Sequence, residues 1–263
     1  MKSPEKIVQH ITQWLSQYLL NAKMEGFVVG VSGGIDSAVT STLCALTAKP
    51  VLCLEMPIRQ DPSQVSRALE HIAWLEAKFP NVRHRSVPLT PVFDAFESLT
   101  QTGEENENRL LSLANTRARL RMTTLYYYAA LHRYIVAGTG NKVEDFGVGF
   151  YTKYGDGGVD LSPIADLMKT EVFKLAKHLS IIESIQQAAP SDGLWGDERT
   201  DEQQLGATYA ELEWAMVAYE QKVDPSTFSE AQKKVFNRFK TLHLQNRHKM
   251  DPIPICKIPS DML

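Results

Sequence analysis

A chain of 263 residues is long enough to bury a substantial core, in one large α/β domain or two small ones. Hydrophobic residues make up 43% and charged residues 22% of it, which is ordinary for a soluble globular protein. A net charge of −3 without a long Lys/Arg block argues against a nucleic-acid surface, and the absence of an 18-residue apolar run argues against a membrane span.

The three cysteines, Cys44, Cys53 and Cys256, are odd in number and have no C-x-x-C spacing. This pattern favours free thiols in a reducing compartment over a disulfide framework or a zinc site. The N-terminal segment is amphipathic and interrupted by polar residues, which is unlike a signal peptide. We therefore expect a cytoplasmic protein that binds neither a membrane nor nucleic acid.

Helical and strand patterns alternate over the first half of the chain. Residues 4–21 have apolar side chains at helical spacing after Ser3-Pro4, a pair typical of an N-cap and first helical position. Short apolar runs predict buried parallel strands at 27–32, 50–56, 82–89 and 134–140. Helices are predicted between them at 37–48, 62–79, 91–99 and 107–133. This alternation predicts an α/β fold with a doubly wound parallel sheet flanked by helices.

The character of the chain changes beyond residue 140. A glycine-rich loop at 147–158 precedes two predicted helices within 169–187. A polar segment at 190–203 then leads to helices at 204–221 and 229–247. No internal repeat or low-complexity segment interrupts the sequence, so we expect one domain over residues 1–263 with a helical C-terminal part.

The stretch FVVGVSGGIDS at 27–37 joins a predicted strand to a helix through a small-residue turn. Glycines allow a close backbone approach to an anion, and amides at a helix N-terminus carry partial positive charge. The stretch contains neither G-x-G-x-x-G nor G-K-[ST], so it is neither a Rossmann dinucleotide loop nor a Walker loop. The alternative is an ordinary turn with an Asp-Ser N-cap.

The same stretch matches S-G-G-x-D-S, the signature of the PP-loop ATP pyrophosphatases, whose fold is Rossmann-like. Hydroxyls and amides of the turn can face pyrophosphate, and Asp36 can hold a Mg²⁺ that bridges the phosphates. The resemblance implies that Asp36 is catalytic and that eight consecutive residues bind ATP: Gly30, Val31, Ser32, Gly33, Gly34, Ile35, Asp36 and Ser37.

Five further stretches resemble one family of this superfamily, the ammonia-dependent NAD synthetases. They are NTRARLRM (115–122), GTGNKVE (138–144), FYTKYGDGGVDLSPIADLMK (150–169), DEQQLGATYAELE (201–213) and HKMDPIP (248–254). The resemblance implies that the carboxylate of deamido-NAD is adenylated by ATP with release of pyrophosphate. Ammonia then attacks the adenylate to give NAD and AMP.

The resemblance assigns a second group of residues to deamido-NAD: Arg119, Lys153, Asp160, His248 and Lys249. Among these, Lys153 and Asp160 are implied to be catalytic because they place the nicotinate carboxylate. From pattern alone, the arginine belongs to a solvated basic helix face, the loop is mobile chain, and the last pair is a charged tail.

Three more residues are assigned to ATP by the resemblance: Thr139, Lys169 and Ser191. Around Ser191 the sequence SDGLW departs from the family's usual T-A-D-L, although a hydroxyl is kept. Glu144 is implied to be the second Mg²⁺ ligand. The step from Glu144 to Lys153 is one residue longer than the commoner family spacing, so Asp145 is an alternative ligand.

The expected partners are ATP, deamido-NAD and ammonia, because the resemblance spans the chain and leaves no segment for a glutamine amidase. The family is usually a homodimer, and the apolar LYYYAAL of the helix at 106–133 suits either an interface or burial within one subunit. Two other functions remain open: another PP-loop ligase, such as a tRNA-modifying or GMP-forming enzyme, and a nucleotide-binding module without catalysis.

Overall fold

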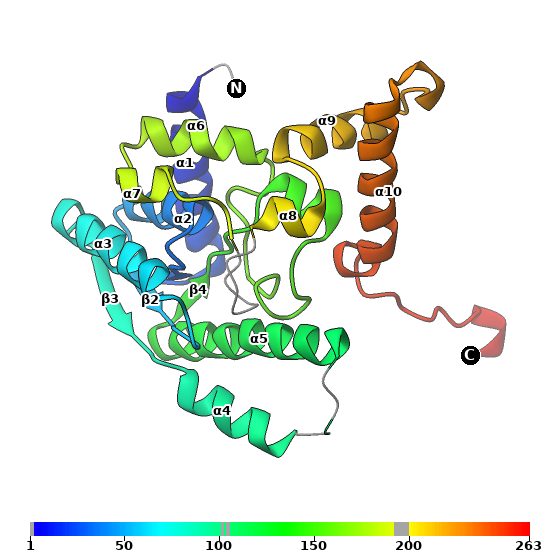
Figure 1. The fold of residues 1–263 in the computed structure, drawn as a ribbon. Helices are drawn as coiled ribbons and strands as arrows, with labels where there is room; N and C mark the ends of the chain where they lie inside the picture. The colour runs from blue at the N-terminus through cyan, green and yellow to red at the C-terminus, as the bar shows by residue number, and fades with distance from the viewer. Residues whose placement is uncertain (1–2, 101–102, 104–105, 192–199) are drawn as a thin grey trace.

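The computed structural model describes residues 3–100, 103, 106–191 and 200–263 (Figure 1). Its centre is a parallel sheet with the order β3-β2-β1-β4. The strands are β1 (Gly26–Gly30), β2 (Val51–Glu55), β3 (Val82–Ser86) and β4 (Tyr134–Val136). All four predicted strands are present, and the predicted α/β class is confirmed.

Helices lie on both faces of this sheet (Figure 1). Those before β4 are α1 (Pro4–Ala22), α2 (Ile35–Leu46), α3 (Pro62–Lys78), α4 (Thr90–Leu99) and α5 (Glu107–His132). Those after it are the π-helix η1 (Val143–Val148), α6 (Lys169–His178), α7 (Glu183–Gln186), α8 (Asp201–Leu205), α9 (Tyr209–Glu220) and α10 (Glu230–Met250). Two short 3-10 turns, η2 (Pro225–Thr227) and η3 (Ser260–Met262), complete the described elements.

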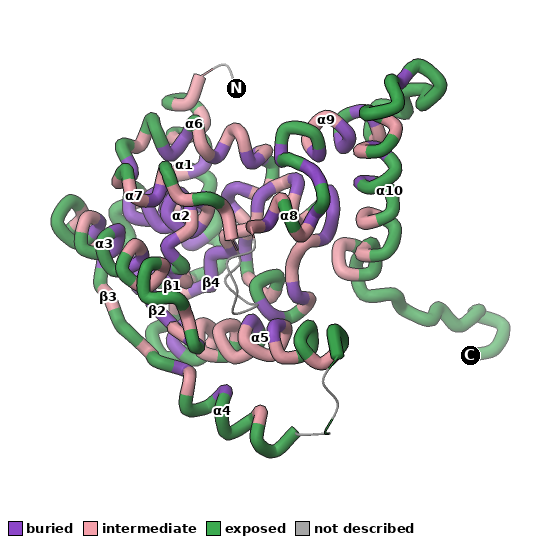
Figure 2. The backbone as a smooth tube through the Cα atoms, in the orientation of Figure 1, coloured by how far each residue is buried: buried purple, intermediate pink, exposed green. Residues whose placement is uncertain are grey.

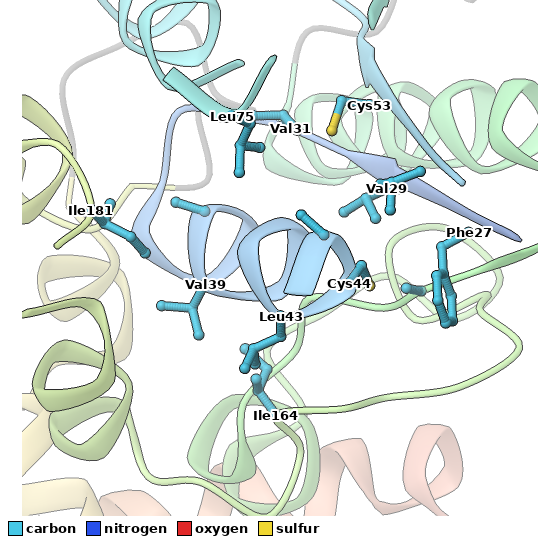
Figure 3. Close-up of a cluster of buried hydrophobic side chains, with 14 of the residues drawn as sticks. Phe27, Val29, Val31, Val39, Leu43, Cys44, Cys53, Leu75, Ile164 and Ile181 are labelled. Carbon is cyan, nitrogen blue, oxygen red and sulfur yellow. The ribbon is translucent and has the colours of Figure 1, made fainter. Parts of the chain in front are cut away.

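Alternate residues of β1 belong to two different hydrophobic clusters. Phe27 and Val29 pack with α1, α2 and α6, whereas Val28 packs with α4 and α5. This period of two is that of a strand covered on both faces, and it explains why its sequence is apolar throughout. Figure 3 shows the first cluster, where the free thiols of Cys44 and Cys53 lie among aliphatic side chains.

A third cluster joins η1, α8, α9 and α10 beside the sheet region. Its largest fully buried side chain is Phe239, which packs with Tyr219. Residues 251–263 then extend away from the body as an exposed segment (Figures 1 and 2). Within the described residues, no helix combines the length and apolar character needed to cross a bilayer.

Several boundaries differ from the sequence prediction. β1 and β3 end at Gly30 and Ser86, before the predicted residues 32 and 89, and the predicted helix at 204–221 is divided into α8 and α9. β4 ends at Val136, and the chain beyond it makes only an isolated parallel bridge from Ala137 to Leu161. The loop predicted from 147 begins inside η1. Of the predicted polar segment 190–203, residues 192–199 lie outside the described residues, and α8 begins at Asp201 with Thr200 as its N-cap.

A buried histidine behind α2 gives the fold a pH dependence. His71 of α3 is fully buried, and its Nε2 is hydrogen-bonded to Ser41 Oγ at 3.1 Å. Burial lowers the pKa of His71 to about 4. The folded pKa of His71 lies below its unfolded value of about 6.5, so the folded state favours the neutral imidazole. The contribution of this neutral imidazole to folding stability is fully present above pH 6.5 and is lost as the pH falls towards 4.

We expect the free energy of unfolding to fall by up to about 3 kcal/mol between pH 6.5 and 4 from this residue alone. Urea unfolding of the wild type and of His71→Gln at several pH values measures the effect. The Gln variant should show a shallower fall, because its side chain does not titrate. Parallel curves for the two proteins would show that His71 is not the group responsible.

Candidate active site

The turn at residues 32–37, here called the phosphate loop, is held by its own two serines. Ser32 N and Gly34 N donate to Ser37 Oγ and Ser32 Oγ, each at 3.2 Å, and Ser37 Oγ donates to Gly34 O at 2.9 Å. The N-cap of α2 is Gly34, which offers no side-chain acceptor to the first amides of the helix. These amides are therefore donors for an anion in front of the helix.

Both the backbone conformation at position 33 and the atoms packed around it require a glycine there. Its φ of +81° lies in the left-handed region, and an added Cβ would lie 2.6 Å from Gln64 O of α3. A side chain would therefore strain the backbone and push the phosphate loop away from α3.

Gly33→Ala should destabilise the fold by roughly 1–3 kcal/mol and weaken ATP binding. Gly34→Ala is the matched control, since Gly34 has an ordinary φ of −93° and its added Cβ would meet only the movable Ser32 hydroxyl, at 3.3 Å. Thermal unfolding and ATP titration measure both effects. Equal loss of thermal stability in the two variants would contradict the role given to the φ of Gly33.

The phosphate loop opens into a cavity of about 270 Å³ at the carboxyl ends of β1, β2 and β4. The eight consecutive residues predicted at ATP, 30–37, all line this cavity. It is also lined by Thr139, Glu144, Asp145, Lys169 and Ser191. The fold therefore brings every residue predicted at ATP or metal to one cavity.

Two carboxylates and one ammonium meet in the lining of the cavity. Asp36, Glu144 and Lys169 are called the carboxylate–lysine cluster below. Lys169 Nζ lies 2.5 Å from Asp36 Oδ2 and 2.9 Å from Glu144 Oε1. The three residues come from the first turns of α2, η1 and α6, so three separate chain segments meet here. The side chain of Lys169 is only 3% exposed.

The cluster shifts the pKa of each member. Burial raises the pKa of Asp36, and Lys169 only partly opposes this. Burial acts in the same direction on Glu144, but Lys169 and a hydrogen bond from Tyr209 outweigh it, so the pKa of Glu144 is lowered. Burial disfavours the charged form of Lys169, yet the two carboxylates outweigh it and raise its pKa. The ammonium therefore stays charged at neutral pH.

Three residues of the cluster's surroundings were given no role by sequence reasoning. Asn141 Nδ2 donates to Asp36 Oδ1 at 3.1 Å. The Tyr209 hydroxyl donates to Glu144 Oε1 at 2.5 Å and lies 3.2 Å from Asp201 Oδ2. All three lie inside stretches that carry the family resemblance, GTGNKVE and DEQQLGATYAELE. Their place in these motifs was the only indication in the sequence that they belong to the site.

Asp145, the alternative metal ligand, lines the cavity but stands outside the carboxylate–lysine cluster. Its carboxylate lies beside Gly140, where any Cβ would overlap it. Burial, with further contributions from Glu144, Asp156 and Asp36, raises the pKa of Asp145 well above its usual value. Among the described residues, no group of three or more His, Cys, Asp or Glu has the arrangement of a metal site.

The residues predicted at deamido-NAD lie outside this cavity lining. Arg119 is exposed on α5, and its Nη2 reaches Lys153 O at 3.4 Å. Lys153 Nζ donates to His248 O at 2.6 Å, so three of the five predicted residues lie together. Lys249 Nζ donates to two backbone carbonyls of the neighbouring loop.

Asp160 stands apart from these residues. Its Oδ2 accepts from Val136 N at 2.8 Å, and its Oδ1 accepts from the Tyr126 hydroxyl at 3.0 Å. Both oxygens therefore bind groups of the chain itself, and they tie the loop to β4 and to α5. Burial, together with Asp160, raises the pKa of Tyr126, which keeps this hydroxyl a donor at neutral pH.

Residues 7–253 match the family described as NAD synthase. An NH(3)-dependent NAD(+) synthetase of Carboxydothermus hydrogenoformans is 40% identical over 210 residues, 80% of this chain and 84% of that protein. One from Syntrophomonas wolfei is 35% identical over 264 residues, 99% of each chain.

Two solved structures are similar over almost their whole length. The NMN synthetase of Francisella tularensis has a TM-score of 0.84 and 34% identity, covering 99% of this chain and 100% of that one. The NH3-dependent NAD synthetase of Campylobacter jejuni has a TM-score of 0.79 and 27% identity, covering 98% and 100%. The chain therefore belongs to the NAD synthase family, a family of ligases.

Proposed function

We propose that the protein is an ammonia-dependent NAD synthetase. The nicotinate carboxylate of deamido-NAD attacks the α-phosphate of ATP and displaces pyrophosphate, and ammonia then attacks the adenylate and displaces AMP. Adenylation is needed because a carboxylate is a poor electrophile with a poor leaving group. The observation that carries this function is one cavity lined both by the phosphate loop and by the carboxylate–lysine cluster, with Asp36 belonging to both.

The chain's share of this reaction is positioning and charge neutralisation. Amides of the phosphate loop would hold the leaving pyrophosphate, and Lys169 would turn from its carboxylates to the phosphates of bound ATP. Thr139 and Ser191 would hold other parts of the nucleotide, since both line the same cavity. No side-chain nucleophile is required, because the substrate carboxylate itself attacks.

The donor set of the cluster fits Mg²⁺. Carboxylate oxygens are the ligands that this ion prefers, and Asp36 and Glu144 present them to the cavity. The ammonium of Lys169 lies between the two carboxylates, which supports a position that favours positive charge. Asp36 and Glu144 would hold the ion, and Asp145 is near enough in the lining to be the alternative. When bound, Mg²⁺ neutralises charge on the phosphates.

The acid substrate would be held by Arg119 and Lys153, with His248 beside them. A guanidinium fork and an ammonium suit carboxylate and phosphate groups. Asp160 would contribute through the loop that it ties to β4. Free ammonia is the expected nitrogen donor.

The direct test is incubation with ATP, Mg²⁺, ammonium and deamido-NAD. We expect NAD and AMP in equal amounts, and no AMP when deamido-NAD is left out. ATP consumption only with tRNA or xanthosine monophosphate would favour another ligase of the superfamily. Nucleotide binding without turnover would favour a non-catalytic module.

Amidation of the acid mononucleotide is a second candidate function. The observation that favours it is the similarity to the NMN synthetase, whose TM-score and identity exceed those of the Campylobacter jejuni enzyme. The same assay with nicotinic acid mononucleotide in place of deamido-NAD decides between them. The ratio of kcat/KM for the two acids identifies the preferred substrate.

The proposed assembly is a homodimer. Tyr127 and Leu131 on α5 are large apolar side chains with 62% and 59% of their surfaces exposed. Burial of this face against a second copy would remove apolar surface from water. Light scattering after size-exclusion chromatography should give twice the chain mass of 29.5 kDa.

A further inference from the structure

The first turn of α6, which carries Lys169, begins without one of the usual N-cap residues. Lys169 and Thr170 are the first two residues of the helix, and the N-cap is Met168. A Met side chain lacks the oxygen through which Ser, Thr, Asp or Asn accepts from the second or third amide of a helix. Glu171 Oε2 accepts from Met168 N at 3.1 Å, but the second amide of the helix, that of Thr170, has its acceptor on another helix.

Glu213 of α9 supplies that acceptor. Its Oε1 accepts from Thr170 N at 2.8 Å, and its Oε2 accepts from Thr170 Oγ1 at 2.7 Å. Both carboxylate oxygens are thus engaged by one residue, which is 43 positions away in the sequence. α9 begins beside this end of α6 (Figure 1). Two charge-assisted hydrogen bonds to one residue fix both the distance and the orientation of the first turn of α6 relative to α9.

The charge of Glu213 also suits this place. The N-terminus of a helix carries a partial positive charge, and a carboxylate beside it is favourable. Lys169 brings a buried ammonium to the same end of α6, so the local positive charge is larger than the helix alone would give. Asp36 and Glu144 contact that ammonium, whereas Glu213 contacts the backbone amide of the next residue.

The same side of α9 also reaches the side chain of Lys169. Tyr209 and Glu213 are four residues apart and therefore lie on one side of the helix. Lys169 Nζ lies 4.9 Å from the centroid of the Tyr209 ring, and the Tyr209 hydroxyl donates to Glu144. α9 therefore holds Lys169 at two points, which are the backbone that follows it and the ammonium at its end.

We propose that Glu213 is a positioning residue for Lys169: by accepting both donors of Thr170 it fixes the first turn of α6, from which the lysine side chain reaches the cavity. Lys169 lines the cavity, whereas Thr170 and Glu213 are not among the described residues that line it. Glu213 therefore acts through the lysine and not on the nucleotide. Its effect on turnover rests on the proposed function, but the position of the ammonium can be measured without any activity.

The test compares Glu213→Met with Glu220→Met. Met removes both acceptors at about the same side-chain length, and Glu220 is an exposed glutamate at the end of the same helix, so its substitution controls for the loss of charge and for the change to Met. The first readout is the rate at which N-hydroxysuccinimidyl acetate acetylates Lys169 in the nucleotide-free protein, followed by mass spectrometry. Because the Lys169 side chain is only 3% exposed, we expect acetylation at least fivefold faster in Glu213→Met than in Glu220→Met.

Steady-state kinetics, measured well below the Tm of every variant, supplies the second readout. Glu213→Met should lower kcat/KM for ATP at least tenfold while the KM for the acid substrate changes less than twofold, because Lys169 would meet the phosphates of ATP. Glu213→Gln keeps an acceptor for Thr170 N and should stay within threefold of the wild type in both readouts.

A lower Tm of Glu213→Met with wild-type acetylation and wild-type kcat/KM would make Glu213 a stabilising cap alone and would overturn the proposal. A change in only one of the two readouts would overturn it as well, because Glu213 would then not act through the position of Lys169.

Thr170→Val replaces Glu213→Met if that variant does not fold, because it removes only the hydroxyl donor. It should change each readout at least threefold, and wild-type values in both would overturn the proposal. A failure of the proposed function would instead leave the wild type inactive with every acid tested, while the acetylation comparison would still stand.

Discussion

Asp36→Asn should lower the rate of pyrophosphate release by about 10²–10³-fold or more while leaving the fold intact. Asp36 belongs to the phosphate loop and to the first turn of α2, and its carboxylate contacts Lys169. Asn has nearly the same shape, and its oxygen can still accept from Asn141. What disappears is one negative charge at the position that would hold a metal ion.

Asp36→Asn should leave the fold stable because it lowers the number of buried charges. Asp36, Glu144 and Lys169 together carry a net charge of −1 when ionised. The Asn variant leaves Lys169 paired with Glu144 alone, which is a balanced buried pair. Because burial already raises the pKa of Asp36, removal of this charge also removes a desolvation cost.

Pyrophosphate release and thermal unfolding should be measured on the same preparation of Asp36→Asn. A loss of activity with a Tm within a few degrees of the wild type supports the assignment. Near-normal turnover would show that the metal assignment to Asp36 is wrong, and Glu144→Gln together with Asp145→Asn would then locate the acid that matters.

The sheet and the phosphate loop could be predicted from the sequence because they depend on local pattern. β1 and β2 are apolar on both faces, and the glycines of the loop sit where an apolar strand stops. The end of β4 was overestimated because Ala137 continues the apolar run but has only an isolated bridge to Leu161. Apolar character alone does not reveal where a neighbouring strand ends.

The surroundings of the cluster could not be predicted in this way. Tyr209 reaches Glu144 from a helix that is 65 residues further along the chain, and no periodicity encodes that contact. The family motif includes Tyr209 but does not indicate that its hydroxyl contacts Glu144. A π-helix such as η1 likewise has no simple apolar pattern, so its six residues were expected to run partly into a loop.

The pair His248 and Lys249 illustrates what a family motif specifies about a residue and what it leaves to the backbone. His248 and Lys249 stand in the stretch that the family pattern marks, and α10 does bring them to the loop that carries Lys153. Lys249 Nζ donates to two backbone carbonyls beyond the end of η1, whereas His248 Nδ1 lies 3.1 Å from Gln245 O of its own helix. A motif gives the residue type and the neighbourhood, whereas the partner atom depends on the local path of the backbone.

Lys169→Met should lose both activity and stability, in contrast to Asp36→Asn. Met fills a similar volume but leaves Asp36 and Glu144 buried beside each other with a net charge of −2. Breaking a buried ion pair by removing one partner costs about 3–5 kcal/mol. We expect a loss of that size at pH 7.5, with no measurable adenylation.

This loss of stability should depend on pH. In the wild type, Lys169 opposes the effect of burial on the pKa values of both carboxylates. Without it, both folded pKa values rise above the unfolded values of about 4. A raised folded pKa means that the variant is most stable at low pH and loses stability as the pH rises through the folded value.

The difference in the free energy of unfolding between wild type and Lys169→Met should therefore be largest at pH 7.5 and shrink towards pH 4.5. Urea unfolding at these two pH values measures it. Lys174→Met is the control, since Lys174 is an exposed lysine on the same helix α6 and should change stability by less than about 0.5 kcal/mol. A difference in the free energy of unfolding that does not change with pH would contradict this expectation. It would show that Met destabilises the fold by poor packing and that the charge of Lys169 does not stabilise the two buried carboxylates.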